Sequence, residues 1–176
     1  TVAVLAALLL LAGGAAIGRW VRERDRAAWH DLLERIADSV DDLEDRTRRA
    51  AMDVAAREQA ARPVLDLVDR ALTQRPGLGL LHSWRGRVLA VRERWKAAEA
   101  ELDRGCAAAP REPRTWLWRG RYRLERHARF RELPVIEGGA AGLRVHPAKD
   151  ERPAEQRLRL GAVEDLDRVA ALVQAP

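Results

Sequence analysis

The sequence predicts an all-α protein with an N-terminal transmembrane helix, a long connector helix and then antiparallel helical hairpins. Three observations support this fold class. An uncharged run opens the chain, apolar residues then recur at heptad spacing, and the tetrapeptide Trp-Arg-Gly-Arg occurs twice, 34 residues apart. A fixed period of this length is typical of stacked helical hairpins, which form an α-solenoid. Such arrays usually hold partners, so the same observations favour binding over catalysis.

Residues 1–18 are the predicted membrane anchor, because residues 2–18 carry no charge. Roughly 17–25 apolar residues cross the hydrocarbon core of a bilayer. A cleaved signal peptide is the alternative, but its apolar region would usually be only about 7–15 residues long. The sequence therefore predicts a single-pass membrane protein. The arginines that follow the anchor favour a cytoplasmic soluble part. A folded cytoplasmic domain upstream would instead place that part in the periplasm.

Residues 19–60 are predicted to form a juxtamembrane helix. Apolar and small residues alternate there at spacings of three and four, which is a heptad seam, and the remaining positions are rich in charge. One interpretation is a coiled coil that forms a homodimer beside the membrane. The other, which we prefer because the seam weakens towards its end, is an amphipathic helix packed on the first repeat. The seam consists of Trp29, Leu33, Ile36, Val40, Leu43, Thr47, Ala50 and Val54.

Residues 61–133 resemble the tetratricopeptide repeat family, whose 34-residue unit is a helix, a turn and a second helix. A unit that begins at Gly79 matches the family pattern in both of its helices, through its small residues, its aromatic residue and its proline. One unit upstream only the second helix matches, and one unit downstream only the first. Small residues in this pattern let two antiparallel helices approach closely, and a proline ends the second helix. The matching residues are Pro76, Gly86, Trp95, Ala98, Pro110 and Gly120.

Some residues depart from the family pattern. Unit position 7 is usually apolar in the family, but here it is Arg85 and then Arg119. Position 4, where a tryptophan is common, is His82 in the first full unit. The downstream unit is interrupted, so we predict a loop or short hairpin insertion over residues 134–153. Residues 154–176 are then predicted to form a C-terminal helix that belongs to an incomplete repeat.

The resemblance implies a concave peptide-binding groove lined by the first helix of each unit. The groove residues that it assigns are Arg87, Arg121, Arg114, Ser83 and Leu117. Because the guanidinium fork pairs with carboxylates in a bidentate manner, we expect a protein partner that presents an acidic peptide or a C-terminal carboxylate. The alternative is ordinary solvated arginine, since all but two of the 32 basic residues are Arg.

No catalytic residue, metal site or cofactor is predicted. The four histidines are scattered, and the single cysteine, Cys106, is interpreted as a small buried residue. The expected function is a membrane-tethered scaffold for protein–protein interaction. One alternative is the tail of a bacterial serine/threonine kinase, whose catalytic domain would lie upstream of a fragment such as this. Another is Arg-rich binding to nucleic acid or anionic lipid. Nucleic acid is the less expected partner because no nucleic-acid fold signature occurs.

Overall fold

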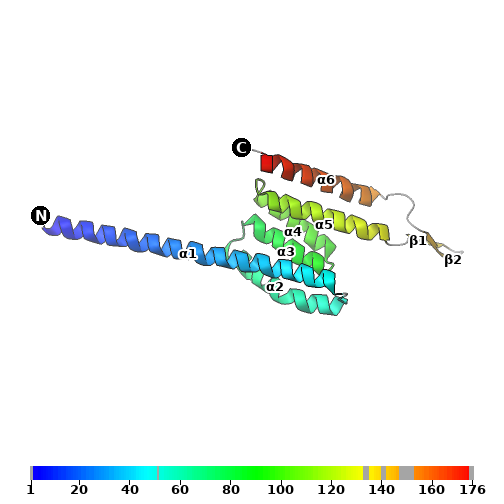
Figure 1. The fold of residues 1–176 in the computed structure, drawn as a ribbon, viewed down its shortest axis with the longest axis horizontal. Helices are drawn as coiled ribbons and strands as arrows, with labels where there is room; N and C mark the ends of the chain where they lie inside the picture. The colour runs from blue at the N-terminus through cyan, green and yellow to red at the C-terminus, as the bar shows by residue number, and fades with distance from the viewer. Residues whose placement is uncertain (1, 51, 133–134, 140–141, 147–152, 175–176) are drawn as a thin grey trace.

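The computed structural model describes the backbone of residues 2–50, 52–132, 135–139, 142–146 and 153–174, and the side chains of residues 23–50, 52–128 and 155–174. Within these residues the chain forms six α-helices and one antiparallel β-hairpin (Figure 1). The predicted all-α class is therefore confirmed apart from that hairpin. The elements are α1 (Val2–Arg49), α2 (Val54–Gln74), α3 (Gly79–Val91), α4 (Trp95–Ala108), α5 (Pro113–Glu132), β1 (Val135–Gly139), β2 (Gly142–His146) and α6 (Pro153–Gln174).

Helix α1 combines the predicted anchor and much of the predicted juxtamembrane helix in one continuous helix of 48 residues. Among the described residues, no helix is both long and apolar enough to cross a bilayer. The anchor predicted at residues 2–18 lies outside the residues whose side chains the structure describes. Its backbone is helical and continues without a break into the rest of α1.

The heptad seam of α1 is buried inside this chain. Ile36, Val40 and Leu43 are fully buried, and they join one core cluster with Val68 of α2 and Trp84 of α3. This part of the seam packs on neighbouring helices, whereas Ala50 and Val54, its predicted last members, lie outside α1 and are exposed. Helix α1 therefore supplies the first helix of a hairpin whose second helix is α2.

The turn between α1 and α2 corrects the predicted boundary at residue 60. Helix α1 ends at Arg49, and α2 begins at Val54. The Asp53 side chain accepts a hydrogen bond from the Ala56 backbone N–H at 2.7 Å, so Asp53 caps the new helix. The juxtamembrane segment is therefore a helix, a turn and the first part of a second helix.

Three helical hairpins stack along the molecule. In the second and in the third, a glycine lies where the two helices of the hairpin approach each other closely. A Cβ atom at Gly86 of α3 would lie 2.7 Å from Leu102 Cγ and 3.0 Å from the Ala98 carbonyl oxygen, both on α4. Gly120 of α5 faces α6 in the same way, because a Cβ atom at Gly120 would lie 3.3 Å from the Ala162 carbonyl oxygen. Helix α6 thus occupies in the third hairpin the place that α4 has in the second.

The third hairpin is complete, but its second helix comes late in the sequence. Ala98 and Ala162 hold equivalent places and are 64 residues apart instead of 34, so 30 extra residues separate the two helices. The β-hairpin falls within this insertion, in the segment predicted to be a loop or short hairpin. The insertion explains why the 34-residue period fails after α5.

Candidate functional site: the groove between α1 and α5

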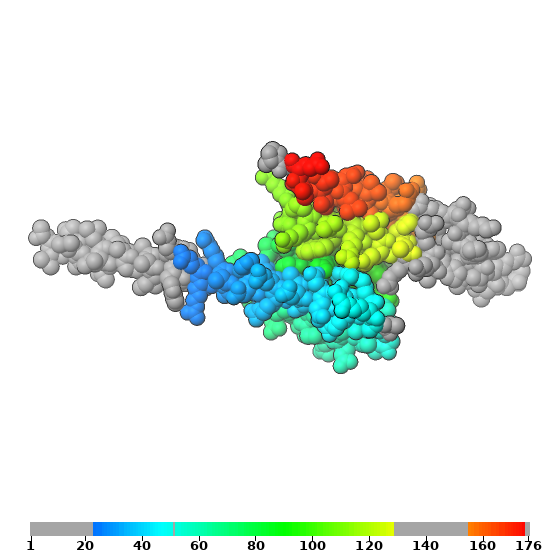
Figure 2. All heavy atoms as spheres, viewed as in Figure 1, coloured from blue at the N-terminus to red at the C-terminus, as the bar shows by residue number. Residues whose placement is uncertain are grey.

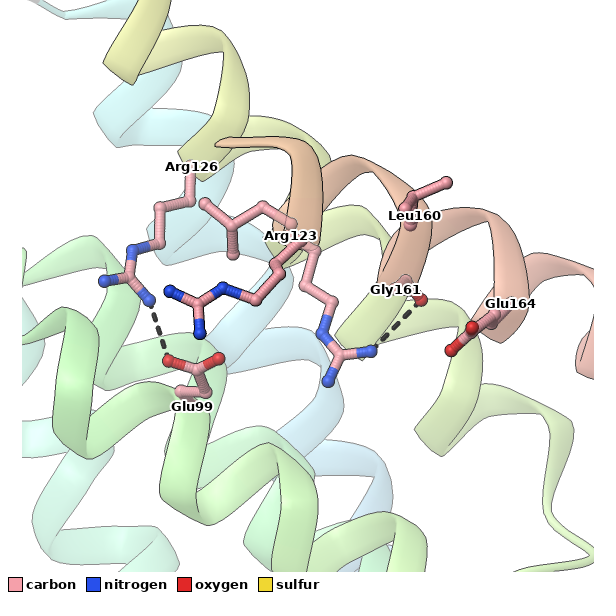
Figure 3. Close-up of a pocket in the computed structure, with 8 residues that line it drawn as sticks. Glu99, Arg123, Arg126, Leu160, Gly161 and Glu164 are labelled. Carbon is pink, nitrogen blue, oxygen red and sulfur yellow. Dashed lines mark hydrogen bonds and ion pairs between the residues drawn. The ribbon is translucent and has the colours of Figure 1, made fainter. Parts of the chain in front are cut away.

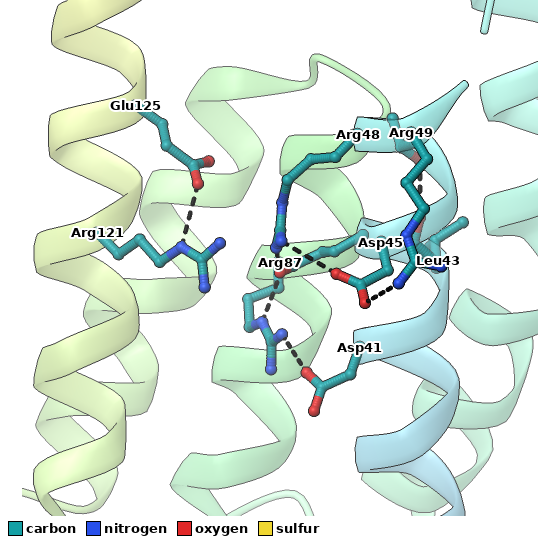
Figure 4. Close-up of polar contacts among 10 residues, drawn as sticks. Asp41, Leu43, Asp45, Arg48, Arg49, Arg87, Arg121 and Glu125 are labelled. Atoms are coloured by element: carbon teal, nitrogen blue, oxygen red, sulfur yellow. Dashed lines mark hydrogen bonds and ion pairs between the residues drawn. The ribbon is translucent and has the colours of Figure 1, made fainter. Parts of the chain in front are cut away.

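Helices α1 and α5 form the walls of a groove whose floor is α3 (Figure 4). A hollow of about 460 Å³ opens there between Glu44 and Thr47 of α1, Ala90 of α3 and Glu125 of α5. Helices α1, α3 and α5 are the first helices of their hairpins, and Arg57 of α2 and Trp95 of α4 also line the hollow. This is the surface to which the sequence assigned the binding residues.

Arg87 lies on the floor of the groove and is already neutralised by α1. Its Nε donates to Glu44 Oε1 at 2.7 Å, and its Nη2 donates to Asp41 Oδ1 (Figure 4). Its guanidinium carbon lies 4.9 Å from the centre of the Trp118 ring, and the residue is only 8% exposed. Burial alone would lower the pKa of Arg87, but the two carboxylates outweigh burial and raise it. The prediction that Arg87 faces a ligand is wrong, because α1 takes that place.

Arg121 has the same unit position as Arg87 but a different environment. Its side chain is 47% exposed, and its Nε donates to Glu125 Oε1 at 3.1 Å within the same helix. Arg114 is 68% exposed and lies 3.9 Å from Glu112. Leu117 is 42% exposed. Three of the five predicted groove residues therefore share the exposed face of α5.

Ser83 lies between α3 and α4 and does not line the groove. It is fully buried, and its Oγ has no hydrogen-bond partner among the described residues. A Cβ atom at Gly105 of α4 would overlap this Oγ. The prediction for Ser83 is corrected on these grounds: a small side chain is needed where the two helices touch, and a ligand could not reach it.

The arginines at unit position 7, which the sequence left unexplained, connect consecutive hairpins. Arg85 of α3 donates to Asp69 of α2 at 2.7 Å, and Arg119 of α5 donates to Asp103 of α4 at 2.8 Å. The two aspartates are themselves 34 residues apart. That spacing is a signal in the sequence that could have revealed the pairs.

Each of these arginines also binds an acid on the second helix of its own hairpin. Arg85 donates to Glu101 of α4 at 3.0 Å, and Arg119 donates to Asp165 of α6 at 2.6 Å. The two acids are only 4% and 1% exposed. Burial would raise the pKa of Glu101, but the hydrogen bond from His82 and the charge of Arg85 hold it below its usual value. Each arginine therefore joins three helices.

The side chains at unit position 4 make the same hydrogen bond in two hairpins, although the residues differ. The Nε2 of His82 hydrogen-bonds the Pro76 carbonyl at 2.8 Å, and the Nε1 of Trp116 donates to the Pro110 carbonyl at 3.1 Å. Both residue pairs are related by the 34-residue period. His82 thus replaces the tryptophan that is common in the family pattern without loss of the bond.

A second hollow, of about 590 Å³, lies among α4, α5 and α6 (Figure 3). Arg126 donates to Glu99 at 2.7 Å, and Arg123 donates to the Gly161 carbonyl at 3.1 Å, so basic and acidic groups alternate in its walls. Arg123 also binds the buried carboxylate of Asp165 at 2.9 Å. These two arginines of α5 therefore pair with neighbouring helices.

Comparison with known proteins adds no family. No family model, curated protein or solved structure matches the chain. Within the described part of the chain, no three His, Cys, Asp or Glu side chains are grouped so that they could hold a metal ion. The tetratricopeptide assignment stays a prediction, with the geometry of the hairpins as its physical basis.

Proposed function

We propose that this chain is a membrane-tethered scaffold of the tetratricopeptide type that holds a protein partner in the groove between α1 and α5. One observation carries the proposal. At equivalent unit positions Arg87 is buried and bound to two carboxylates, whereas Arg121 is half exposed and bound only within its own helix. The groove therefore keeps one arginine for internal stability and one at its surface. No catalysis is proposed for these residues.

The exposed face of α5 beside the groove favours an acidic partner. Arg121 and Arg114 lie on one face of α5, with Leu117 between them and Leu124 one turn further on. Charge-assisted hydrogen bonds from arginine to carboxylate are roughly twice as strong as neutral ones. A partner segment that alternates acidic and apolar side chains would satisfy both kinds of group on this face.

The proposed tether rests on the uncharged run at residues 2–18, which belongs to the same helix as one wall of the groove. One helix contains the predicted anchor at residues 2–18 and, further along, the carboxylates of Asp41 and Glu44 that hold the groove floor. A membrane anchor would thus be built into one wall of the groove. Alkaline carbonate extraction of membranes from expressing cells tests this part. We expect the chain to stay in the membrane pellet, and its release into the supernatant would overturn the tether.

Peptide binding to the full chain in detergent micelles tests the groove. We expect a fluorescent acidic helical peptide to bind more tightly than a basic peptide of equal length and apolar content. Arg121→Glu should weaken the binding of the acidic peptide about tenfold or more. Arg70→Glu is the matched control, because Arg70 is exposed on α2 and, among the described residues, its side chain bonds to the backbone of its own helix. Equal binding of the two peptides, or equal effects of the two substitutions, would refute the proposed groove.

A further inference from the structure

The outer surface of the third hairpin repeats the surfaces that the first two hairpins bury. Val68 of α2, Leu102 of α4 and Leu166 of α6 hold equivalent places in the three hairpins. Val68 and Leu102 are completely buried, since α3 packs on α2 and α5 packs on α4. Leu166 is 37% exposed. Helix α6 forms the outer edge of the stack in Figure 1 and, in orange to red, in Figure 2.

The acid that binds the next hairpin also recurs on α6. Asp69 accepts a hydrogen bond from Arg85, and Asp103 accepts one from Arg119. In both cases the arginine belongs to the hairpin that follows. The equivalent aspartate on α6 is Asp167. It directly follows Leu166 in the sequence, just as Asp69 directly follows Val68. Asp167 is exposed, and no ion pair to it occurs among the described residues. The surface therefore retains the acid without the arginine.

Helix α5 supplies an apolar border to the same surface. Leu117 and Leu124 are 42% and 41% exposed. Their equivalents on α3 are Ser83, which is buried, and Ala90, which is half-buried. Ser83 is covered by α4 of its own hairpin, whereas Ala90 packs against the cluster that contains Tyr122 of α5. A helix that lay against both α5 and α6, as α5 lies against α3 and α4, would therefore cover Leu124 and Leu166, with Leu117 at the edge of the contact. We call this surface the end face and define it by Leu117, Leu124, Leu166 and Asp167.

The two helices that already dock in this way share one pattern of side chains. In each helix a tryptophan is followed directly by the arginine. Two further residues face the core, one three positions before the tryptophan and one four positions after it. The core residues are mostly apolar, and all of them are buried or half-buried. The two sets are Leu81, Trp84, Arg85 and Val88 in α3, and Thr115, Trp118, Arg119 and Tyr122 in α5.

We propose that the end face docks an amphipathic helix of a partner protein that presents such a Trp-Arg pair, with its arginine bound to Asp167. Charge complementarity carries the choice of occupant, because the equivalent aspartate binds an arginine in both hairpin contacts of the structure. The docked helix covers the exposed leucines of the end face. The end face borders the exposed face of α5 that carries Arg114 and Arg121 and shares Leu117 and Leu124 with it, but its partner has the opposite charge requirement.

A charge-reversal experiment tests the end face. The probe is a fluorescent peptide with the sequence of residues 113–128, which carries the pattern of α5, and the protein is the full chain in detergent micelles. Asp167→Arg should weaken binding about tenfold, and a peptide with Arg119→Glu should recover binding to that variant. Glu164→Arg is the matched control, because it makes the same charge change on α6 but lines the hollow of Figure 3.

Three results would overturn the end-face assignment. The first is an equal effect of the Asp167 and Glu164 substitutions. The second is failure of the reversed peptide to recover binding. The third is sedimentation of the full chain as a dimer that Asp167→Arg dissociates, because a second copy would then occupy the face. Leu117→Glu provides an independent variant. It should weaken binding of the peptide and leave the helical circular dichroism of the protein unchanged. Asp167 is not among the residues that line the groove, so Asp167→Ala should leave the affinity of the acidic groove peptide unchanged, and failure of the groove and failure of the end face can be distinguished.

Discussion

Removal of the Arg87 side chain tests whether α1 is an integral wall of the repeat array. In Arg87→Ala, Asp41 and Glu44 lose the cation on α3, so that Glu44 keeps only Arg48 of its own helix, and the Trp118 ring loses the guanidinium stacked on it. Glu44 is the more affected acid, because its side chain is only 16% exposed, whereas that of Asp41 is 66% exposed. The substitution therefore removes the polar link between α1 and α3.

The expected loss of stability lies between two limits. Breaking one partner of a fully buried ion pair costs about 3–5 kcal/mol, and an exposed pair contributes about 0–1 kcal/mol. Arg87 is buried but one of its two acids is not, so we expect a loss of about 2–3 kcal/mol. For a chain of this size that corresponds to a decrease in Tm of about 5–10 °C.

Thermal unfolding of the full chain in detergent, followed by circular dichroism, measures this loss. Arg121→Ala is the matched control, since it removes the same side chain at the same unit position from an exposed pair within one helix. The control should lose only about 0.3–0.5 kcal/mol. Hydrogen exchange should show added opening of the second half of α1 in Arg87→Ala alone. Equal decreases in Tm for the two variants would refute the claim that Arg87 fastens α1.

Four further measurements follow from the packing. Gly86→Ala should cost about 1–3 kcal/mol in urea unfolding, more than Gly120→Ala, because the added Cβ meets α4 more closely than α6. The pKa of Glu101 is held below 4.5, so its contribution to stability is present above pH 4.5 and is lost as the pH falls; Glu101→Gln should flatten the acid decrease in Tm. Burial raises the pKa of Tyr122, the only tyrosine, to about 12, and ultraviolet titration should find it there and not near 10. Arg85→Leu should destabilise the chain, and a second substitution, Glu101→Leu, should restore stability.

Local patterns in the sequence were enough to predict most of the helices. The heptad seam placed Ile36, Val40 and Leu43 on one face of α1, and that face is buried. The glycines of the doubled tetrapeptide sit where paired helices touch. These predictions succeeded because close approach and apolar periodicity depend on residues near one another in the chain.

The environment of the groove could not be predicted in the same way. Arg87 and its acids on α1 are more than 40 residues apart, so the pair depends on how two helices stack. The family pattern assigns Arg87 and Arg121 to one role, but only Arg87 has α1 beside it. The third hairpin was also hard to recognise, because an insertion moves α6 out of the 34-residue period. Long-range contacts of this kind leave no periodic signal.

The arginines at unit position 7 show why an apolar residue there would not be equivalent. Apolar burial is non-directional, and the hairpins present similar aliphatic surfaces to one another. An arginine that binds one acid in its own hairpin and one in the preceding hairpin adds direction to that contact. The cost is the burial of Glu101, which is offset by Arg85 together with Arg104 and His82. Arg85→Leu alone removes one of these partners and also leaves Asp69 without its arginine, at an expected cost of about 1–3 kcal/mol. Replacing Glu101 with leucine as well removes the less well compensated buried charge and should recover most of the loss. If Arg85→Leu were as stable as the parent chain in urea, the arginine would be an ordinary solvated side chain and would not join the hairpins.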